Sequence, residues 1–142
     1  MDFKKEKSAG YLANHMARLF ANALHERIRP LGLAPAQFMT LLELWEGDGL
    51  TQKDLVQRLD VEQATMANTL NRMERDGLIE REENPKDRRA RVIRLTDKAR
   101  GLEADAKATA NEVNGIALSG LSEDERRVFV KTMTRVIGAL SG

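Results

Sequence analysis

The segment TQKDLVQRLDVEQATMANTLNRMERDGLIERE (residues 51–82), followed by NPKDRRARVIRLTDKAR (residues 84–100), decides the fold of this chain. In its first half the apolar residues have the spacing of helices, and in its second half they alternate as in strands. The period changes at Gly77, a residue type that commonly ends helices. The segment therefore predicts two helices followed by a β-hairpin.

The two predicted helices are short and consecutive. Thr51 with Asp54 three residues later suits a helix N-terminus, and this helix is expected to end before Asp60. The second helix covers residues 62–76. Its buried stripe consists of Met66, Leu70 and Met73.

The predicted hairpin has a basic tip. Residues 78–82 and 91–95 have the pattern of short strands, joined by the polar loop 83–90. Between Asn84 and Arg94 there are five basic side chains and one acidic one, although the net charge of the whole chain is only +1. Such a charge run by itself is also typical of a solvated surface loop.

Amphipathic helices are predicted on both sides of this segment. Residues 8–29 form a long one, and a second begins at Pro35 and runs to about Glu46. After the hairpin, a very long helix starts at Thr96, and Ser122 with Glu125 is a capping box for a last one. The apolar face of that last helix consists of Phe129, Met133, Val136, Ile137 and Leu140.

The second helix of the central pair carries different chemistry on its two faces. If its apolar stripe faces inward, the opposite face presents two Arg and no acid, whereas an ordinary surface helix more often mixes Glu and Lys. Asn and Arg can read base edges, and small Ala or Thr allows close approach to DNA. The residues concerned are Ala64, Asn68, Asn71 and Arg75, with Thr65 and Arg72 on the flanks. This face predicts insertion into the major groove.

The hairpin tip predicts a second contact with DNA. A narrow minor groove attracts Arg, so Arg88 and Arg89 both suit insertion, and the sequence does not decide between them. Asp87 is placed to hold one of these guanidinium groups. Phosphate contacts are expected from Lys86, Arg91 and Arg94.

The segment resembles the MarR family of winged helix–turn–helix regulators. The motifs DGLIER (76–81), NPKDRRA (84–90) and RLTDKAR (94–100) occur in the order that the family shows. The resemblance is strong from about Leu33 to Leu102, and the flanking helices fit by length and position.

The resemblance implies a mainly α-helical fold with a small β-hairpin wing. A winged helix–turn–helix DNA-binding domain (33–97) would lie between two parts of a helical dimerisation layer (1–32 and 98–142). It also implies a homodimer that binds double-stranded DNA at a pseudo-palindromic operator and regulates transcription, most often as a repressor. Two-fold symmetry then places the half-sites about one helical turn apart.

The resemblance also assigns residues by position. The recognition helix falls on 62–76 and the wing on 82–91, with an ion pair between Asp87 and Arg89 that orients the arginine. Asn68 stands where many relatives have Arg, which leaves the operator sequence open. The complete predicted DNA-binding set is Thr51, Gln52, Gln63, Ala64, Thr65, Asn68, Thr69, Asn71, Arg72, Arg75, Lys86, Asp87, Arg88, Arg89 and Arg91.

A small-molecule effector is the further partner that the resemblance implies. Regulators of this kind often bind phenolic or other aromatic anions in a cleft between the dimerisation layer and the winged domain. The lining residues expected by position are His15, Arg18, Phe38, Leu42 and Trp45. Such a pocket has apolar walls, but the last three residues, at helical spacing, are more typical of core residues than of a ligand site.

Other classes of function find little support in the sequence. The chain has no Cys, and its two histidines, His15 and His25, lie too far apart around one helix to share a metal ion. It has no Gly-rich phosphate loop and no nucleophile elbow, so we predict no enzyme, no cofactor and no metal site. Two alternatives stay open: a winged-helix dimer serving as a protein-interaction scaffold, and an architectural binder indifferent to DNA sequence.

The composition predicts a soluble cytoplasmic protein. Hydrophobic residues make up 42% and charged residues 32% of the 142 residues. No apolar run approaches the roughly 20 residues that a membrane span requires, and the charged start is not a secretory signal.

Overall fold

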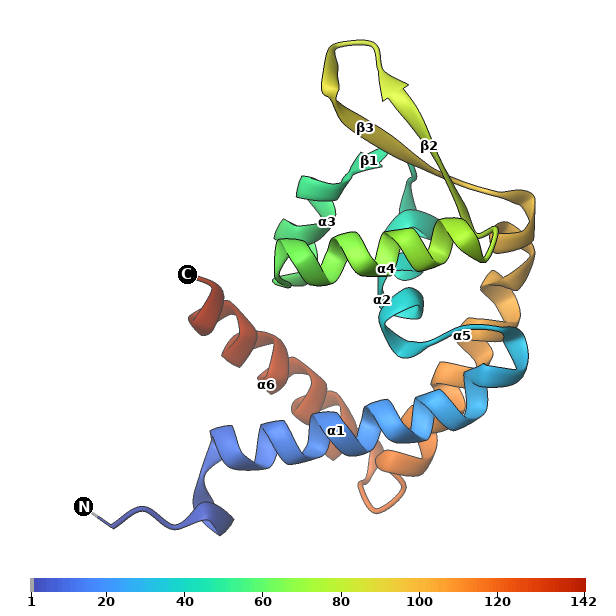
Figure 1. Ribbon diagram of the computed structural model, residues 1–142. Helices are drawn as coiled ribbons and strands as arrows, with labels where there is room; N and C mark the ends of the chain where they lie inside the picture. The colour runs from blue at the N-terminus through green and yellow to red at the C-terminus, as the bar shows by residue number, and fades with distance from the viewer. Residues whose placement is uncertain (1) are drawn as a thin grey trace.

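The computed structural model describes residues 2–142, which form a mainly helical chain with one small antiparallel sheet (Figure 1). The predicted fold class is confirmed. The helices are α1 (Ala9–Ile28), α2 (Pro35–Glu46), α3 (Gln52–Leu59), α4 (Gln63–Arg75), α5 (Asp97–Ala117) and α6 (Glu123–Ser141). Short 3₁₀ turns, η1 (Lys5–Lys7) and η2 (Arg29–Leu31), precede and follow α1.

The local signals in the central segment act as predicted. The hydroxyl oxygen of Thr51 accepts from the backbone N–H of Asp54, and the Asp54 carboxylate accepts from the backbone N–H of Thr51, so α3 begins with a capping box. Asp60 ends α3 in a left-handed conformation. Gly77 follows α4 with φ of 75°, a conformation that disfavours residues with a Cβ.

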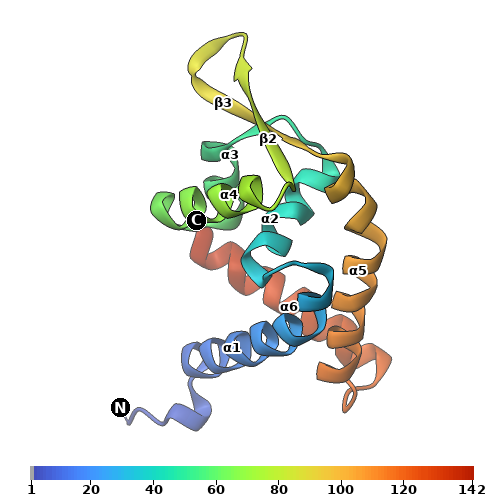
Figure 2. The same ribbon diagram turned by 45° about the vertical axis from the view of Figure 1, so that its right-hand side comes forward.

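The sheet has the strand order β1–β3–β2, from β1 (Leu50–Thr51), β2 (Ile79–Asn84) and β3 (Asp87–Leu95). Strands β2 and β3 form the wing, which projects from the rest of the chain (Figures 1 and 2). The predicted loop 83–90 is too long, because pairing continues to Asn84 and Asp87 and leaves two residues in the turn. The short strand β1 was not predicted, because two residues are too few to show alternation.

The core of the winged domain lies between α2, α3, α4, the sheet and the first turn of α5. The predicted stripe of α4 is its centre: Met66, Leu70 and Met73 are buried, as is Leu55 of α3. Leu78, Ile79 and Ile93 of the wing base complete the packing against them. The wing and α4 are therefore held on one packed core.

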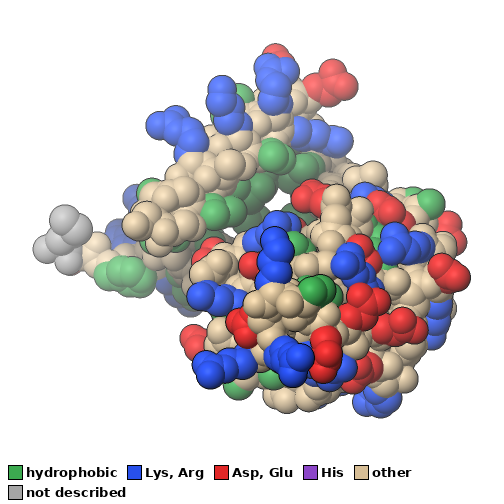
Figure 3. Space-filling model, turned by 90° about the horizontal axis from the view of Figure 1, so that it is seen from above, with side chains coloured by type: hydrophobic (Ala, Val, Ile, Leu, Met, Phe, Trp, Pro, Cys, Tyr) green, Lys and Arg blue, Asp and Glu red, His purple; other side chains and the backbone are tan. Residues whose placement is uncertain are grey.

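The remaining helices pack much less completely. Helix α1 packs on α5, but α6 extends away from the body and has no buried residue (Figures 1 and 2). Of its predicted apolar face, Val136, Ile137 and Leu140 are 52%, 61% and 85% exposed. Seen from above, apolar side chains line the hollow between α6 and the rest of the chain, while Lys and Arg lie on the outer edge of α6 (Figure 3). None of the helices within residues 2–142 is both long and apolar enough to cross a membrane.

Candidate DNA-binding surface

The outward face of α4 is exposed and carries the polar residues that the helical spacing placed there. Opposite the buried stripe, side chains are available to a ligand along the whole helix. The exposed residues are Gln63, Ala64, Thr65, Asn68, Asn71, Arg72 and Arg75. The width of such a helix and its side chains suits the major groove of B-DNA.

Thr69 does not lie on this face. Its side chain is only 8% exposed, and its hydroxyl donates to the backbone carbonyl of Thr65 (2.9 Å). The position falls between the inward and outward faces of α4, and the structure turns it inward. We therefore leave Thr69 out of the candidate surface.

Arg75 is exposed but not free. Its Nε donates to the Asp76 carboxylate at 3.0 Å, and the Gln37 side chain donates to the same carboxylate at 3.0 Å. The hydrogen bonds from Arg75 and then from Gln37 lower the pKa of the Asp76 carboxyl. Contact between Arg75 and DNA would therefore require its guanidinium to leave or share this partner. Arg72 has no such partner within residues 2–142.

The start of α3 lies beside the start of α4. The Gln52 side chain donates to the side-chain oxygen of Gln63 at 3.2 Å, which ties together the N-terminal turns of the two helices. The Thr51 hydroxyl takes part in the capping box of α3, and the residue lies half-buried at the same edge. The predicted residues Thr51, Gln52 and Gln63 thus form one continuous edge.

The wing tip presents an exposed basic turn. Lys86, Arg88 and Arg89 are exposed, and no carboxylate pairs with them within residues 2–142. The Asp87 carboxylate accepts from the backbone N–H of Arg89 at 3.0 Å, and the Asn84 side chain accepts from that of Lys86. The ion pair between Asp87 and Arg89 that the resemblance implied is therefore absent here, and Asp87 shapes the turn instead.

Arg94 is not available for the phosphate contact expected of it. Its guanidinium pairs with Glu82 at 3.2 Å and with Asp48 at 3.3 Å. The hydrogen bond to Glu82 is the main reason that the pKa of Arg94 is raised. Asp48 also accepts from Arg100 of α5 (3.1 Å) and from the backbone N–H of Leu95. Asp48 therefore links the wing base, through Arg94 and Leu95, to Arg100 at the start of α5.

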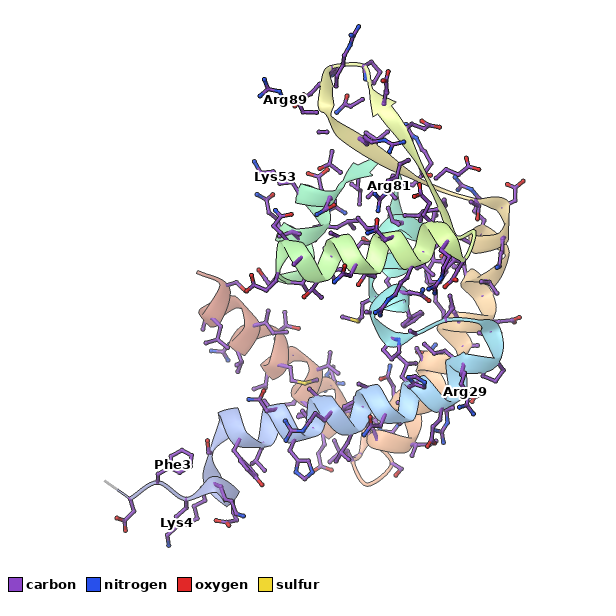
Figure 4. The ribbon with its side chains drawn as sticks, in the orientation of Figure 1. Phe3, Lys4, Arg29, Lys53, Arg81 and Arg89 are labelled. Atoms are coloured by element: carbon purple, nitrogen blue, oxygen red, sulfur yellow. The ribbon has the colours of Figure 1, made fainter. Side chains whose placement is uncertain are left out.

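Two basic residues of this region were missed by the sequence analysis. Lys53, in the first turn of α3, projects on the same side of the winged domain as Arg89 (Figure 4). Arg81 lies between the wing strands and α4, where its Nη2 donates to the Asn71 side-chain oxygen at 3.0 Å (Figure 4). Arg81 follows Ile79 in a simple strand alternation, and nothing in that pattern shows its contact with α4.

A cavity of about 660 Å³ lies between α1, α2 and α5, where the effector cleft was expected. Phe38 and Leu42 line it, as predicted. His15 and Arg18 do not line it: both are exposed on α1. The polar groups that do line it all come from α5 and were not predicted: Lys107, Asn111 and Asn114.

Trp45 is likewise outside this cavity. Its indole N–H donates to the backbone carbonyl of Ala99 at 3.1 Å, and its ring meets that of Phe38 edge-on. It ties α2 to the first turn of α5. Trp45 is therefore a core residue, as its helical spacing also indicated.

A helix pair with an exposed polar second helix, followed by a basic hairpin, defines a winged helix–turn–helix DNA-binding protein. The MarR family model matches residues 31–90, which hold the helix pair and most of the wing. A MarR transcriptional regulator from Methanosarcina mazei Go1 shares 27% identity over 92% of this chain and 94% of that chain, with a TM-score of 0.86. The predicted resemblance to the MarR family is confirmed by this model match and by MarR regulators that share the fold over nearly the whole chain, and members of that family are transcription regulators.

Two further solved structures share the fold and carry ligands. A MarR family transcriptional regulator from Listeria monocytogenes, complexed with 26mer DNA, has 23% identity over 95% of this chain and 90% of that chain, with a TM-score of 0.87. CouR from Rhodococcus jostii RHA1, bound to p-coumaroyl-CoA, has 21% identity over 99% of this chain and 96% of that chain, with a TM-score of 0.82.

Proposed function

We propose that this protein is a sequence-specific regulator of transcription that binds a pseudo-palindromic operator as a homodimer and acts as a repressor. The main observation behind the proposal is that α4 and the wing present two exposed polar surfaces from one packed domain. The exposed face of α4 offers Asn68, Asn71 and Arg72 to base edges, and the wing offers Arg88 and Arg89 to an adjacent minor groove. The regulator of the same fold that was solved with 26mer DNA supports this use of the surface.

The rest of the proposed surface contacts the DNA backbone. Lys53, Lys86 and Arg91 are exposed around the edge of the face, where they can contact phosphates. Such contacts position the protein without reading sequence, and they make its affinity fall with salt. Specificity is then left to the outward residues of α4 and to the wing tip.

The second copy in the proposed dimer covers the apolar faces that one chain leaves open. A hollow of about 610 Å³ lies between α1, the end of α5 and α6, and its lining is mostly apolar. Leu19 on α1 and Ile116 on α5 are 57% and 58% exposed beside it. Exposed apolar groups on this scale mark an interaction surface, and a two-fold dimer presents two α4 helices to one face of a duplex.

A small aromatic or phenolic anion is the proposed effector, bound between α1, α2 and α5. The cavity walls are apolar, including Phe20, Leu24 and Phe38, and the cation available to an acidic ligand is Lys107. Lys107 pairs with Glu103 at 2.6 Å, so an anion would have to compete with that carboxylate. The related fold with p-coumaroyl-CoA supports a ligand with an aromatic acyl part. An effector changes DNA affinity only by its differential affinity for the two states.

Selection of bound DNA from a random duplex pool, with the salt dependence of the winning site, tests the DNA-binding part of the proposal. We expect a palindromic motif whose affinity falls steeply with salt, because several phosphates are neutralised. Binding with no enriched motif would favour the architectural alternative. No binding even at low salt would favour the protein-interaction scaffold.

Salicylate, as a simple phenolic acid, tests the effector part with that operator. We expect it to change operator affinity in the native protein and to lose most of this effect in Lys107→Met, which keeps the aliphatic stem but removes the cation. Arg18→Met, on the same helical layer but outside the cavity, is the matched control. Equal responses in both variants would contradict the assignment of Lys107.

A further inference from the structure

Two asparagines on the outward face of α4 are in different states. Asn68 and Asn71 are both exposed, but only Asn71 has a protein partner within residues 2–142. That partner is Arg81 of β2, whose Nη2 donates to the side-chain oxygen of Asn71 at 3.0 Å. Figure 4 shows Arg81 placed between the wing strands and α4.

The chemistry of arginine fixes the orientation of the Asn71 amide. A guanidinium has five N–H donors and no acceptor, so the atom of Asn71 that faces it must be the oxygen. The amide NH₂ then has to point away from Arg81. No acceptor for the Asn71 NH₂ occurs within residues 2–142, and the side chain is exposed.

The guanidinium of Arg81 has few partners other than Asn71. Its Nε is buried without a hydrogen-bond partner, and no carboxylate pairs with it within residues 2–142. A hydrogen bond from a charged donor is about twice as strong as a neutral one. The strand around Arg81 is braced as well, since Arg91 donates to its backbone carbonyl at 3.0 Å.

We propose that Arg81 is a positioning residue for DNA recognition, which turns the Asn71 amide so that its NH₂ group faces the base. A free asparagine pairs with adenine by donating to N7 and accepting from the N6 amino group. Because its oxygen is turned toward Arg81, Asn71 offers its NH₂ group to a base. In this orientation it meets one acceptor on adenine (N7) but two on guanine (N7 and O6), so guanine is favoured over adenine. Asn68, which is free to turn, keeps the ability to pair with adenine.

This inference rests on the proposed function, because it concerns how the recognition helix reads a base. It requires that the base preference of one position in each half-site depends on a residue of the wing strand. A purely structural role for Arg81 would change stability or overall affinity instead, with the same loss for every sequence.

The test is the random-duplex selection repeated with variants. Asn71→Asp identifies the position that residue 71 contacts: the aspartate can still pair with Arg81 but can no longer donate, so the preference for guanine should fall about tenfold there. Asn68→Asp is the matched control, with the same added charge on the same face, and it should change a different position.

Arg81→Met is the decisive variant, because it keeps an aliphatic side chain and frees the Asn71 oxygen. At the position that Asn71→Asp identifies, we expect adenine to gain about tenfold relative to guanine, with the other positions unchanged. Arg81→Lys should retain most of the native preference, because an ammonium is also only a donor. Melting curves of each variant check that the fold is retained.

Unchanged base preferences in Arg81→Met, or equal losses for all sequences, would overturn the inference while the proposed function stands. Should Arg81→Met fail to fold, the base that the native protein selects at the position identified by Asn71→Asp decides: guanine supports the inference, and adenine overturns it. A native protein that enriches no motif would overturn both the inference and the proposed function.

Discussion

The winged domain and the helical layer of this chain differ in how completely they are packed. Helix α4 buries Met66, Leu70 and Met73 against its own chain, although it has only 13 residues. Helix α6 has 19 residues and buries none of them. Both helices are amphipathic, so the difference lies in what covers the apolar face. Neighbouring elements cover that of α4, whereas within residues 2–142 the apolar face of α6 is covered only in part, at Phe129 and Met133.

This difference indicates that the two regions use different partners to bury their apolar side chains. The winged domain can form its core within one chain, since α2, α3, the sheet and the first turn of α5 surround α4. In the proposed homodimer, a second chain buries the apolar surface of the helical layer. Changes in the first region should therefore act on folding, and changes in the second should act on association.

The largest effect is expected from Leu70→Asp in the winged core. Leu70 is 1% exposed, so the variant buries an unpaired carboxylate. We expect a loss of about 4 kcal/mol or more of unfolding free energy. Thermal and urea unfolding measure it, and Asn71→Asp, one residue along on the exposed face, is the control. A native-like melting temperature for Leu70→Asp would show that α4 has another register.

The next effect is expected from Ile137→Asp in α6. Ile137 is 61% exposed in one chain, so the change should leave the winged domain folded but weaken association of the two chains by at least about tenfold. Thr134→Asp, on the polar side of the same helix, is the matched control. Sedimentation over a range of protein concentrations measures both. Equal association constants for Ile137→Asp and Thr134→Asp would place the interface elsewhere.

Arg89→Ala at the wing tip should weaken operator binding roughly tenfold and relax specificity at the flanking A·T positions, because a narrow minor groove attracts Arg. Arg88→Ala, the neighbouring exposed arginine, is the comparison that decides which of the two enters the groove. Titration of operators with altered flanks gives the result. If neither variant changes the flank preference, the wing does not read the minor groove.

The smallest effect is expected from Lys86→Ala, since a phosphate contact is not specific for sequence. The variant should lose affinity nearly uniformly across operators and reduce the slope of log affinity against log salt by roughly 1. Binding isotherms at several salt concentrations check this. A loss confined to particular sequences would mean that Lys86 reads bases.

The sequence predicted the fold well because its signals are local. The capping box at Thr51, the stripe of Leu70 and the break at Gly77 each act within a few residues, and helix bounds follow from them. The wing was predicted too short because its pairing through Asn84 and Asp87 lies in a polar stretch without alternation.

The candidate site was predicted less completely, because contacts between distant residues decide it. Arg94 pairs with Asp48, which is 46 residues away along the chain, and Arg81 of β2 donates a hydrogen bond to Asn71 of α4. Thr69 faces inward although it borders the outward face. The polar lining of the α1–α2–α5 cavity comes from α5, a helix whose register against the others no sequence pattern reveals.

The central claim is that the winged domain is complete in one chain whereas the helical layer is completed by a second. The most direct measurement is the mass of the native protein in solution, alone and bound to one selected operator duplex. We predict the mass of two chains for the free protein, and the mass of two chains plus one duplex for the complex. A single-chain mass over the whole range of concentrations, or one chain on each duplex, would contradict the account.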